Sequence, residues 1–473
     1  MKKAFMGVRL KRLREERRLT QQALADALSI SLSYLNQIEN NQRPLTVSVL
    51  LKLNAVFGTD VQFFSDDDDA RLIGELREAL SDPAIGEPVS AADLRELAGN
   101  MPALARAFIS QGRRLKQASD QAAAYAARLG DDRQGGFASA PSTPFEEVRD
   151  FFYDSRNYVD GLDRAAEAVA RELGMPLGRM GPALAGRLEA LHGVRLANLA
   201  DDIGSSVQRR YDPITRTLWL SRGLRRSQQA FQMATQLAFL EQRGLMDELV
   251  TSGSFSNEEA RSLARIGFAN YFAGALTLPY QPFLQLAERL RYDIDLIGRE
   301  FGVGFETVCH RLSTLQRPEA RGVPFFLIRV DRAGNISKRQ SATDFHFSRV
   351  GGTCPLWNVY DAFSNPGRIL TQVAEMPDGR AYLWVARMVE SSRGGFRAPA
   401  KTFAIGLGCD LHHAGRLVYS QGIVQDDPAA RTLIGAGCKV CERPACPQRA
   451  FPPLTRTLMV DDSQSSFAPY STG

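Results

Sequence analysis

The spacing of apolar residues predicts a series of short helices at the start of the chain. Apolar positions within 8–19 fall on one side of a helix whose other side carries arginines. Thr20 and Ser31 each stand directly before a further apolar run, where a hydroxyl side chain caps a helix N-terminus. Arg43-Pro44 ends the third helix, and a fourth is expected over 47–57. The positions of the third helix that we expect to face inward are Leu32, Leu35 and Ile38.

A second helical region is expected over residues 70–129. Ser90 is expected to cap one of its helices, after which apolar residues recur at spacings of three and four. These apolar positions are Leu94, Leu97, Met101, Leu104 and Phe108. The stretch 113–129 is rich in Ala and Gln and could form a dimerising helix.

The remaining patterns predict a linker and then a mixed region, so the expected fold is mainly α with an α+β sensor. Residues 131–144 are rich in Gly, Ser and Pro and are typical of a linker. The segment 145–315 is mostly helical in pattern, with a strand, turn and strand near 207–219. The expected units are a helix-turn-helix domain over 1–65, a helical linker and dimerisation region over 66–144, a mainly helical domain over 145–318 and a cysteine-rich α+β domain over 319–473.

Positive charge is concentrated at the N-terminus. The whole chain has a formal net charge of +5, while residues 1–58 hold ten Lys and Arg against four acidic residues. A basic head on a nearly neutral body predicts that the head binds a polyanion such as double-stranded DNA. Without a run of about 18 apolar residues we expect no membrane association, and without the apolar core of a signal peptide we expect a cytoplasmic protein.

The basic head resembles the lambda-repressor or Cro-like helix-turn-helix family. The resemblance rests on Thr-Gln-x-x-Leu-Ala, Ser-x-x-Tyr-Leu-x-x-Ile-Glu and an Arg-Pro pair, which follow one another within 20–44. The N-terminal residues of the second helix of such a pair enter the major groove. We predict base contacts by Ser31, Ser33, Tyr34 and Gln37, and phosphate contacts by Gln21 and Arg43. The alternative is a helical packing module whose basic face is only solvated.

The middle of the chain resembles the zinc peptidases of the ImmA/IrrE type. Where that family has its His-Glu-x-x-His zinc motif, this chain has Gln232, Met233 and Gln236, and its five histidines lie elsewhere. Gln and Met supply neither good zinc ligands nor a general base. We therefore expect a degenerate zincin-like domain that is not an enzyme, and whose vacant site can serve as a binding pocket.

Four of the six cysteines form a spaced group near the C-terminus. In the pattern C-x28-C-x2-C-x4-C, followed by proline, they are Cys409, Cys438, Cys441 and Cys446. In a reducing compartment, four thiolates suit an iron–sulfur cluster or zinc. The pattern favours a [4Fe–4S] cluster, with zinc as the alternative and unligated, reduced cysteines as the other reading. Cys309 is expected in the core, and Cys354 is a candidate to substitute for one of the four ligands.

The order of these parts along nearly all 473 residues resembles the short-chain fatty acyl-CoA regulators. The motifs that carry the resemblance are the helix-turn-helix, the segment 269–279 and the cysteine-bearing segments 406–411 and 437–452. The resemblance implies transcriptional control of propionyl-CoA, glyoxylate or related acyl-CoA metabolism. It also implies a coenzyme A ester such as propionyl-CoA as effector, and an iron–sulfur cluster in the C-terminal domain.

Binding of an acyl-CoA requires cations or backbone donors for its phosphates, an aromatic face for adenine and an apolar channel for pantetheine. The candidates, drawn from segments that mix aromatic and cationic residues, are Phe152, Tyr153, Arg156, Arg210 and Tyr271. The alternative is that these aromatic residues belong to the core. A palindromic operator also requires two DNA-binding heads, so we expect a homodimer or a higher homo-oligomer on promoter DNA.

Two other functions remain open at this stage. One is a DNA-binding metallopeptidase that cleaves a repressor, which the missing zinc motif disfavours. The other is an iron–sulfur redox sensor that regulates transcription without a small-molecule effector. Promoter binding measured with and without acyl-CoA, and then with and without oxidation, separates these functions from an acyl-CoA-controlled regulator.

Overall fold

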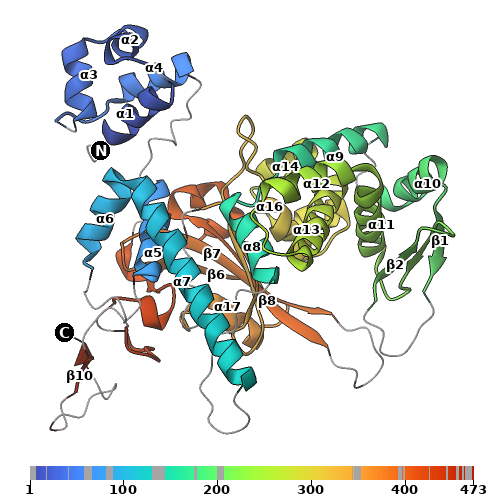
Figure 1. Cartoon of the computed structure of the whole chain (residues 1–473). Helices are drawn as coiled ribbons and strands as arrows, with labels where there is room; N and C mark the ends of the chain where they lie inside the picture. Colours follow the sequence, from blue (N-terminus) through green and yellow to red (C-terminus); the bar gives the residue numbers. More distant parts are fainter. Residues whose placement is uncertain are drawn as a thin grey trace. The chain divides into compact units, whose positions relative to one another are not determined.

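The structure is a computed structural model, and it describes residues 7–17, 19–40, 42–57, 67–80, 89–129, 144–174, 178–199, 207–343, 345, 353–391, 397, 400–424, 427–443, 446–453, 458–460, 463 and 471–472. Apart from Pro144, the predicted linker over 131–144 lies outside these residues. The chain forms two compact units, 1–119 with 344–350 and 451–473, and 120–343 with 351–450. Figure 1 colours the first unit's N-terminal helices blue and follows the second unit from green to orange.

The first unit is built mainly from helices. They are α1 (Gly7–Glu16), α2 (Gln21–Ala27), α3 (Leu32–Glu39), α4 (Val47–Phe57), α5 (Asp67–Ala79), α6 (Ala91–Asn100) and most of α7 (Pro102–Leu129). Near the C-terminus, β10 (Leu458–Met459) pairs antiparallel with β11 (Ser471–Thr472). Among the described residues, no helix is long and apolar enough to cross a membrane.

The predicted caps of the N-terminal helices are confirmed. Thr20 Oγ1 accepts a hydrogen bond from the backbone N–H of Ala23 at 3.1 Å, and Ser31 Oγ accepts one from that of Tyr34 at 3.2 Å. These bonds satisfy N–H groups that the first turn of a helix leaves without a carbonyl partner. The buried residues of this small core are Leu10, Leu13, Leu24, Ala25, Leu28, Leu35, Ile38, Leu45, Val49 and Leu53.

The inward orientation predicted for Leu32 is wrong. Leu35 and Ile38 are fully buried, but Leu32 is 42% exposed. Leu32 is the first residue of α3 and follows the Ser31 cap, three residues before Leu35. Leu32 lies on the same side of α3 as Leu35 and the buried Glu39, but in the first turn, where the core of the domain does not cover it.

The prediction that one apolar face continues through Met101 to Phe108 is also wrong. Ser90 caps α6 as predicted, and its side chain forms a capping box with Asp93. However, α6 ends at Asn100 and α7 begins at Pro102, because proline starts a helix readily but cannot continue one. The break changes the buried face: Ala105 and Ile109 of α7 pack with Leu76, Leu94 and Ala98, while Met101, Leu104 and Phe108 are exposed.

The second unit combines a helical part with two sheets. Its helices are α8 (Pro144–Asp154), α9 (Asp160–Glu172), α10 (Met180–His192), α11 (Arg226–Glu241), α12 (Arg243–Ser252), α13 (Glu258–Thr277), α14 (Tyr280–Arg289), α15 (Ile294–Phe301), α16 (Phe305–Leu312) and α17 (Asn358–Asp361). The predicted strand pair is β2 (Arg209–Asp212) with β3 (Thr217–Leu220), and the structure adds β1 (Arg195–Asn198) parallel to β3.

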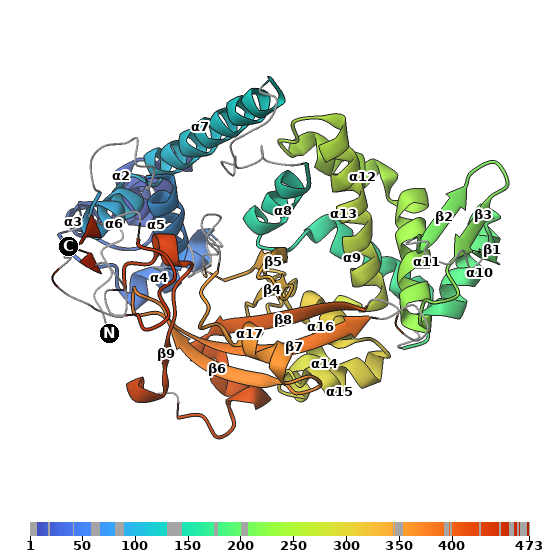
Figure 2. The same ribbon diagram turned by 90° about the horizontal axis from the view of Figure 1, so that it is seen from below.

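The larger sheet has six strands in the order β5-β4-β8-β7-β6-β9. They are β4 (Phe326–Val330), β5 (Ile336–Ser341), β6 (Leu370–Glu375), β7 (Ala381–Ser391), β8 (Lys401–Asp410) and β9 (Thr432–Leu433), and all neighbours pair antiparallel except β6 with β9. Helices α14, α15 and α16 lie beside this sheet in Figure 2, and they share one apolar core with it.

The two faces of this sheet have different neighbours. Leu383 and Leu407 join the core shared with α14–α16. On the opposite face, Trp384 packs against Phe326 and Trp357, with ring centroids 4.6 and 5.2 Å apart. Successive side chains of a strand point to opposite faces, so a residue's position in its strand fixes which of these two environments it enters.

Candidate functional site

Helix α3 presents the predicted DNA-contacting residues on and beside its exposed side. Ser31 and Ser33 are exposed, and Gln37 is half-buried. Tyr34 packs partly against the domain core, and the Arg43 guanidinium lies 5.7 Å from its ring centroid. Ser31 and Ser33 thus lie at the start of α3, while Gln37 lies in its last turn and Arg43 follows the helix beside Tyr34.

Gln21 occupies a different position in the domain. Its Nε2 donates to Glu39 Oε2 at 2.7 Å, and Glu39 also accepts a hydrogen bond from Arg14 Nε at 2.7 Å. The hydrogen bond to Glu39 raises the pKa of Arg14. The Gln21 amide thus helps to hold α1, α2 and α3 together.

The second unit contains a cavity of about 450 Å³. Its walls come from α8, α11, α13, α16 and the β5 edge of the larger sheet. Figure 2 shows α8 beside α13 and the β4–β5 hairpin, and α8 packs against both α13 and β5. A volume of about 300–1,000 Å³ is usual for a pocket that holds a small organic ligand.

Two buried amide oxygens in the cavity wall have no hydrogen-bond partner. Asn157 is fully buried; its Nδ2 donates to Ser313 Oγ at 2.7 Å, but its Oδ1 is unpartnered. Gln340 Nε2 donates to His310 Nε2 at 3.2 Å, and Gln340 Oε1 is likewise unpartnered. An unpaired buried acceptor costs about 1–3 kcal/mol, so a ligand N–H donor would gain affinity at either oxygen if the amide turned to face the cavity.

The charges in the cavity wall are compensated. Burial lowers the pKa of His310 to about 3, so this imidazole is neutral at physiological pH. The four cations of the wall each lie within 4 Å of a carboxylate, in the pairs Arg149–Glu146, Lys338–Glu306, Arg339–Asp150 and Arg311–Asp163. The cavity interior therefore suits an uncharged polar or apolar group better than a free anion.

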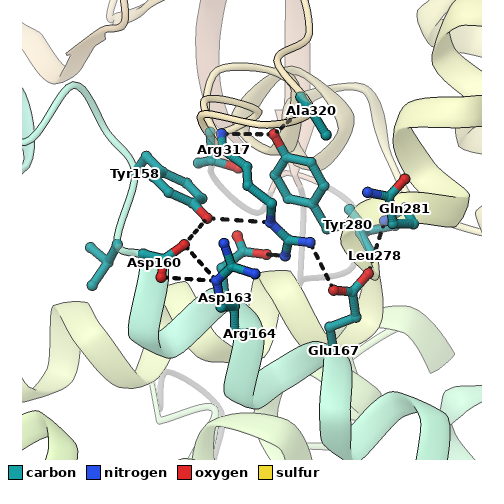
Figure 3. Close-up of polar contacts among 12 residues, drawn as sticks. Tyr158, Asp160, Asp163, Arg164, Glu167, Leu278, Tyr280, Gln281, Arg317 and Ala320 are labelled. Atoms are coloured by element: carbon teal, nitrogen blue, oxygen red, sulfur yellow. Dashed lines mark hydrogen bonds and ion pairs between the residues drawn. The ribbon is translucent and has the colours of Figure 1, made fainter. Parts of the chain in front are cut away.

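One of these cations belongs to a buried ionic network, part of which is shown in Figure 3. Asp163 is fully buried and accepts hydrogen bonds from Arg311 Nη1 at 2.7 Å and from the Tyr271 hydroxyl at 2.9 Å. Arg317 lies between Asp163 and Glu167, with its guanidinium 4.1 Å from the centroid of the Tyr280 ring. Tyr271 and Arg311 also line the cavity, so the network fixes part of its wall.

Two of the five predicted acyl-CoA contacts lie in this cavity. Phe152 and Tyr271 line it, with nearly parallel rings 6.3 Å apart. Tyr153 is buried away from the cavity wall. Arg156 and Arg210 are exposed and do not line it, and Arg210 instead lies 6.0 Å from the ring centroid of Trp219. Sequence reasoning missed Asn157, His310 and Gln340, because their segments are far apart along the chain.

The positions of the lost zinc motif lie on α11, at and behind the cavity wall. Gln232 lines the cavity and donates to Gln208 Oε1 at 3.0 Å, while Met233 is part of the core. Gln236 accepts a hydrogen bond from Arg209 Nη1 at 3.1 Å. Burial lowers the pKa of Arg209 to about 10, so its guanidinium stays charged. A cation thus faces one of the positions where a zinc peptidase carries a ligand.

The cysteines are grouped differently from the predicted set. Cys438, Cys441 and Cys446 line a small pocket whose fourth cysteine is Cys354. Cys409 instead pairs with Leu383 in the sheet and shares the core with α14–α16, and burial raises its pKa. The pocket lies on the other side, because the Trp357 indole contacts Trp384 and donates to the carbonyl of Gly435 in the pocket wall. The structure therefore groups Cys354, and not Cys409, with the other three cysteines.

Among the residues that the structure describes, the pocket of these four cysteines offers sulfur ligands and no carboxylate or imidazole. The backbone N–H groups of Leu356 and Gly435 donate to the Cys354 sulfur, although burial raises the pKa of this thiol to about 11. Arg443 and Arg449 line the same pocket, where positive charge favours thiolates. Within the described ranges, no three Cys, His, Asp or Glu side chains are close enough to hold a metal ion. Cysteine thiolates are the residue type that binds an iron–sulfur cluster or zinc, but these four would have to move closer together to hold either.

Comparison with known proteins gives three domain matches in chain order. A helix-turn-helix family matches residues 10–64, the IrrE N-terminal-like domain matches 190–313, and the C-terminal domain of the short-chain fatty acyl coenzyme A regulators matches 314–470. The three segments together account for most of the chain.

Full-length relatives are bacterial regulators. The HTH-type transcriptional regulators PrpR and RamB of Mycobacterium tuberculosis are each 51% identical, across 99% of this chain and 96% and 99% of theirs. The propionyl-CoA carboxylase regulator of Cereibacter sphaeroides is 43% identical across 99% of this chain and 98% of its own. A solved structure of a Mycobacterium tuberculosis transcriptional regulator is 56% identical, covers 70% of this chain and 99% of its own, and has a TM-score of 0.67.

Proposed function

The chain belongs to the family of short-chain fatty acyl coenzyme A regulators, and from this premise we propose that it controls genes of propionate or related acyl-CoA metabolism in response to an acyl-CoA bound in the cavity of its second unit. Like its full-length relatives, it is a helix-turn-helix transcriptional regulator. It is not an enzyme. The IrrE-like domain retains a peptidase-like sequence without the zinc motif.

The observation that carries the effector proposal is the pair of unpartnered acceptors in the cavity. The pantetheine arm of coenzyme A has two amide N–H groups on an otherwise uncharged chain. Asn157 Oδ1 and Gln340 Oε1 are covered by protein atoms, so each amide must turn towards the cavity before it accepts from such a donor; the aromatic ring of Phe152 supplies apolar surface. We expect the acyl group and pantetheine inside the charge-compensated cavity, with the phosphates and adenine towards solvent.

A substitution at Gly274 tests this placement. Gly274 lines the cavity from α13, and a Cβ at this position would meet no atom within 4 Å. The Gly274→Phe side chain should therefore enter the cavity without disturbing the helix. We expect isothermal titration calorimetry to show binding of propionyl-CoA to the wild type, and at least about tenfold weaker binding to Gly274→Phe.

The matched control is Gly274→Ala, which makes the same backbone change but leaves the cavity open. It should bind propionyl-CoA as the wild type does and unfold at the same or a slightly higher temperature, because alanine favours a helix. Equal affinity for Gly274→Phe and the wild type would place the effector elsewhere.

The DNA surface is proposed to comprise Ser31, Ser33, Tyr34, Gln37 and Arg43, with the start of α2 at Gln21 on the phosphate backbone. We expect Gln37→Ala to weaken operator binding by about 1–3 kcal/mol and to relax the preference for one base pair. Arg43→Ala should weaken binding to all sequences alike. It should also reduce, by about 1, the steepness with which the logarithm of DNA affinity falls against the logarithm of salt concentration. Mobility shifts on the protein's own promoter measure both effects, with Arg95→Ala in α6 as control. If neither variant differs from that control, the assigned surface is wrong.

The bound metal group is proposed to be a [4Fe–4S] cluster held by Cys354, Cys438, Cys441 and Cys446, with zinc as the alternative. The sulfur-only donor set and the N–H donors to Cys354 support a thiolate-bound group. Such a group, when bound, would join the segment around Cys354 to the loop that carries the other three cysteines.

Dimerisation is proposed to involve α7. Met101 and the α7 residues Leu104, Phe108 and Leu115 are exposed apolar residues at spacings of three, four and seven. This is the spacing of one side of a two-helix coiled coil, which a second copy of the same helix can cover. Two copies would supply the paired heads that a palindromic operator requires.

A further inference from the structure

Leu32 is an exposed apolar residue at the start of the DNA-reading helix. It is 42% exposed, whereas Leu35 and Ile38 on the same helix are fully buried. The Ser31 cap fixes the first turn of α3, so Leu32 has a defined position there. An exposed leucine is ordinary on a protein surface, but this one lies where the N-terminal residues of such a helix approach base edges.

Helix α3 itself adds no exposed charge to this surface. Over its eight residues α3 contains no lysine, arginine or histidine, and its single carboxylate, Glu39, is buried against Arg14. Ser33 and Asn36 are exposed beside Leu32, and Asn36 Oδ1 accepts from Asn40 Nδ2 at 2.8 Å. The cationic bidentate contact that most often reads guanine is therefore not available from α3 itself.

An apolar side chain recognises one feature of the major groove. The C5-methyl group of thymine is the apolar group that base pairs present there, and aliphatic side chains contact it. Amide side chains such as Asn36 are suited to the adenine edge. We infer that Leu32 contacts a thymine methyl group in each operator half-site, and that α3 reads A·T pairs.

The test removes the methyl group from the DNA and the aliphatic group from the protein separately. Duplexes are first selected with the full-length wild-type chain from a random 20-base-pair library. Each thymine of a selected duplex is then replaced singly by deoxyuridine, which keeps the base pair but lacks the methyl group. At one thymine per half-site we expect about fivefold weaker wild-type binding, because burying one methyl group is worth about that factor.

Leu32→Ala should bind the unmodified duplex about fivefold more weakly and be indifferent to deoxyuridine at that thymine, since the contact is already lost. Leu51→Ala is the matched control, because Leu51 is a leucine of the same domain that is 59% exposed on α4. It should keep the wild-type pattern. The inference is overturned if the wild type tolerates deoxyuridine at every thymine, or if Leu32→Ala is as sensitive as the wild type at the same positions. Because the wild-type arm needs no variant, a folding defect cannot obscure the result.

Discussion

Replacing Asp163 with alanine is expected to lower the free energy of unfolding of the second unit by about 3–5 kcal/mol. The carboxylate is fully buried and lies against two guanidinium groups, with Arg311 Nη1 at 2.7 Å and Arg317 Nη2 at 3.4 Å. Both arginine side chains are themselves at most 5% exposed. Removal of Asp163 would leave the buried Arg311 side chain without its carboxylate, while Arg317 would keep Glu167.

The same substitution should affect the cavity. The Tyr271 hydroxyl donates to Asp163 and accepts from the backbone N–H of Val159, so it loses one of its two partners. Tyr271 and Arg311 both line the cavity, and we expect propionyl-CoA affinity to fall along with stability. The link between network and cavity offers a route by which a bound effector could favour one arrangement of the protein.

A neighbouring carboxylate supplies the control for this prediction. Asp160 is one turn of α9 before Arg164 and pairs with it at 2.8 Å, but the carboxylate is 52% exposed. Half-exposed ion pairs contribute little, so Asp160→Ala should unfold at nearly the wild-type denaturant concentration. Urea unfolding of the full-length chain, followed by circular dichroism, measures both variants. Equal losses for Asp163→Ala and Asp160→Ala would show that the buried network is not a main source of stability.

The second large effect is expected at the cysteines. If the proposed cluster is bound, Cys354→Ala should abolish it, because Cys354 lines the same pocket as Cys438, Cys441 and Cys446. Cys409→Ala should keep it, because Cys409 faces the core on the opposite side of the sheet. Cys309→Ala, another buried cysteine of that core, is the matched control. The measurement is the visible absorption spectrum, with iron and sulfide analysis, after anaerobic purification.

Each alternative gives a distinct result in this experiment. Loss of the cluster in Cys409→Ala together with its retention in Cys354→Ala would restore the set predicted from sequence spacing. Stoichiometric zinc without iron or sulfide in the wild type would end the cluster proposal. In that case Cys354→Ala should lose zinc while Cys409→Ala keeps it.

Local features of the fold were predictable because they depend on neighbouring residues. The caps at Thr20, Ser31 and Ser90 and the hairpin of β2 and β3 follow from short stretches of sequence, and the structure confirms them. The buried phase of α7 was not predictable from apolar spacing alone. Because one helix ends before Pro102 and the next begins there, a different side of α7 faces the core. Small residues such as Ala105 are therefore buried instead of Leu104.

The site residues that sequence reasoning missed depend on tertiary structure. Spacing groups Cys409 with the later cysteines, but strand alternation in β8 directs its side chain away from them. Asn157 and Gln340 are separated by most of the second unit, and only the packing of α8 against β5 places both in one cavity. An Asn and a Gln also carry no motif, and their importance appears only when an oxygen of each is found without a partner.

The central claim is that an acyl-CoA in the cavity controls promoter binding. The most direct measurement is a mobility shift on the protein's own promoter, titrated with propionyl-CoA, for the wild type, Gly274→Ala and Gly274→Phe. A coupling free energy of about 1–3 kcal/mol predicts a 5- to 150-fold change in promoter affinity for the first two proteins and none for Gly274→Phe. Promoter affinity that does not respond to acyl-CoA in the wild type, but changes when the protein is oxidised, would contradict the account and favour a redox sensor.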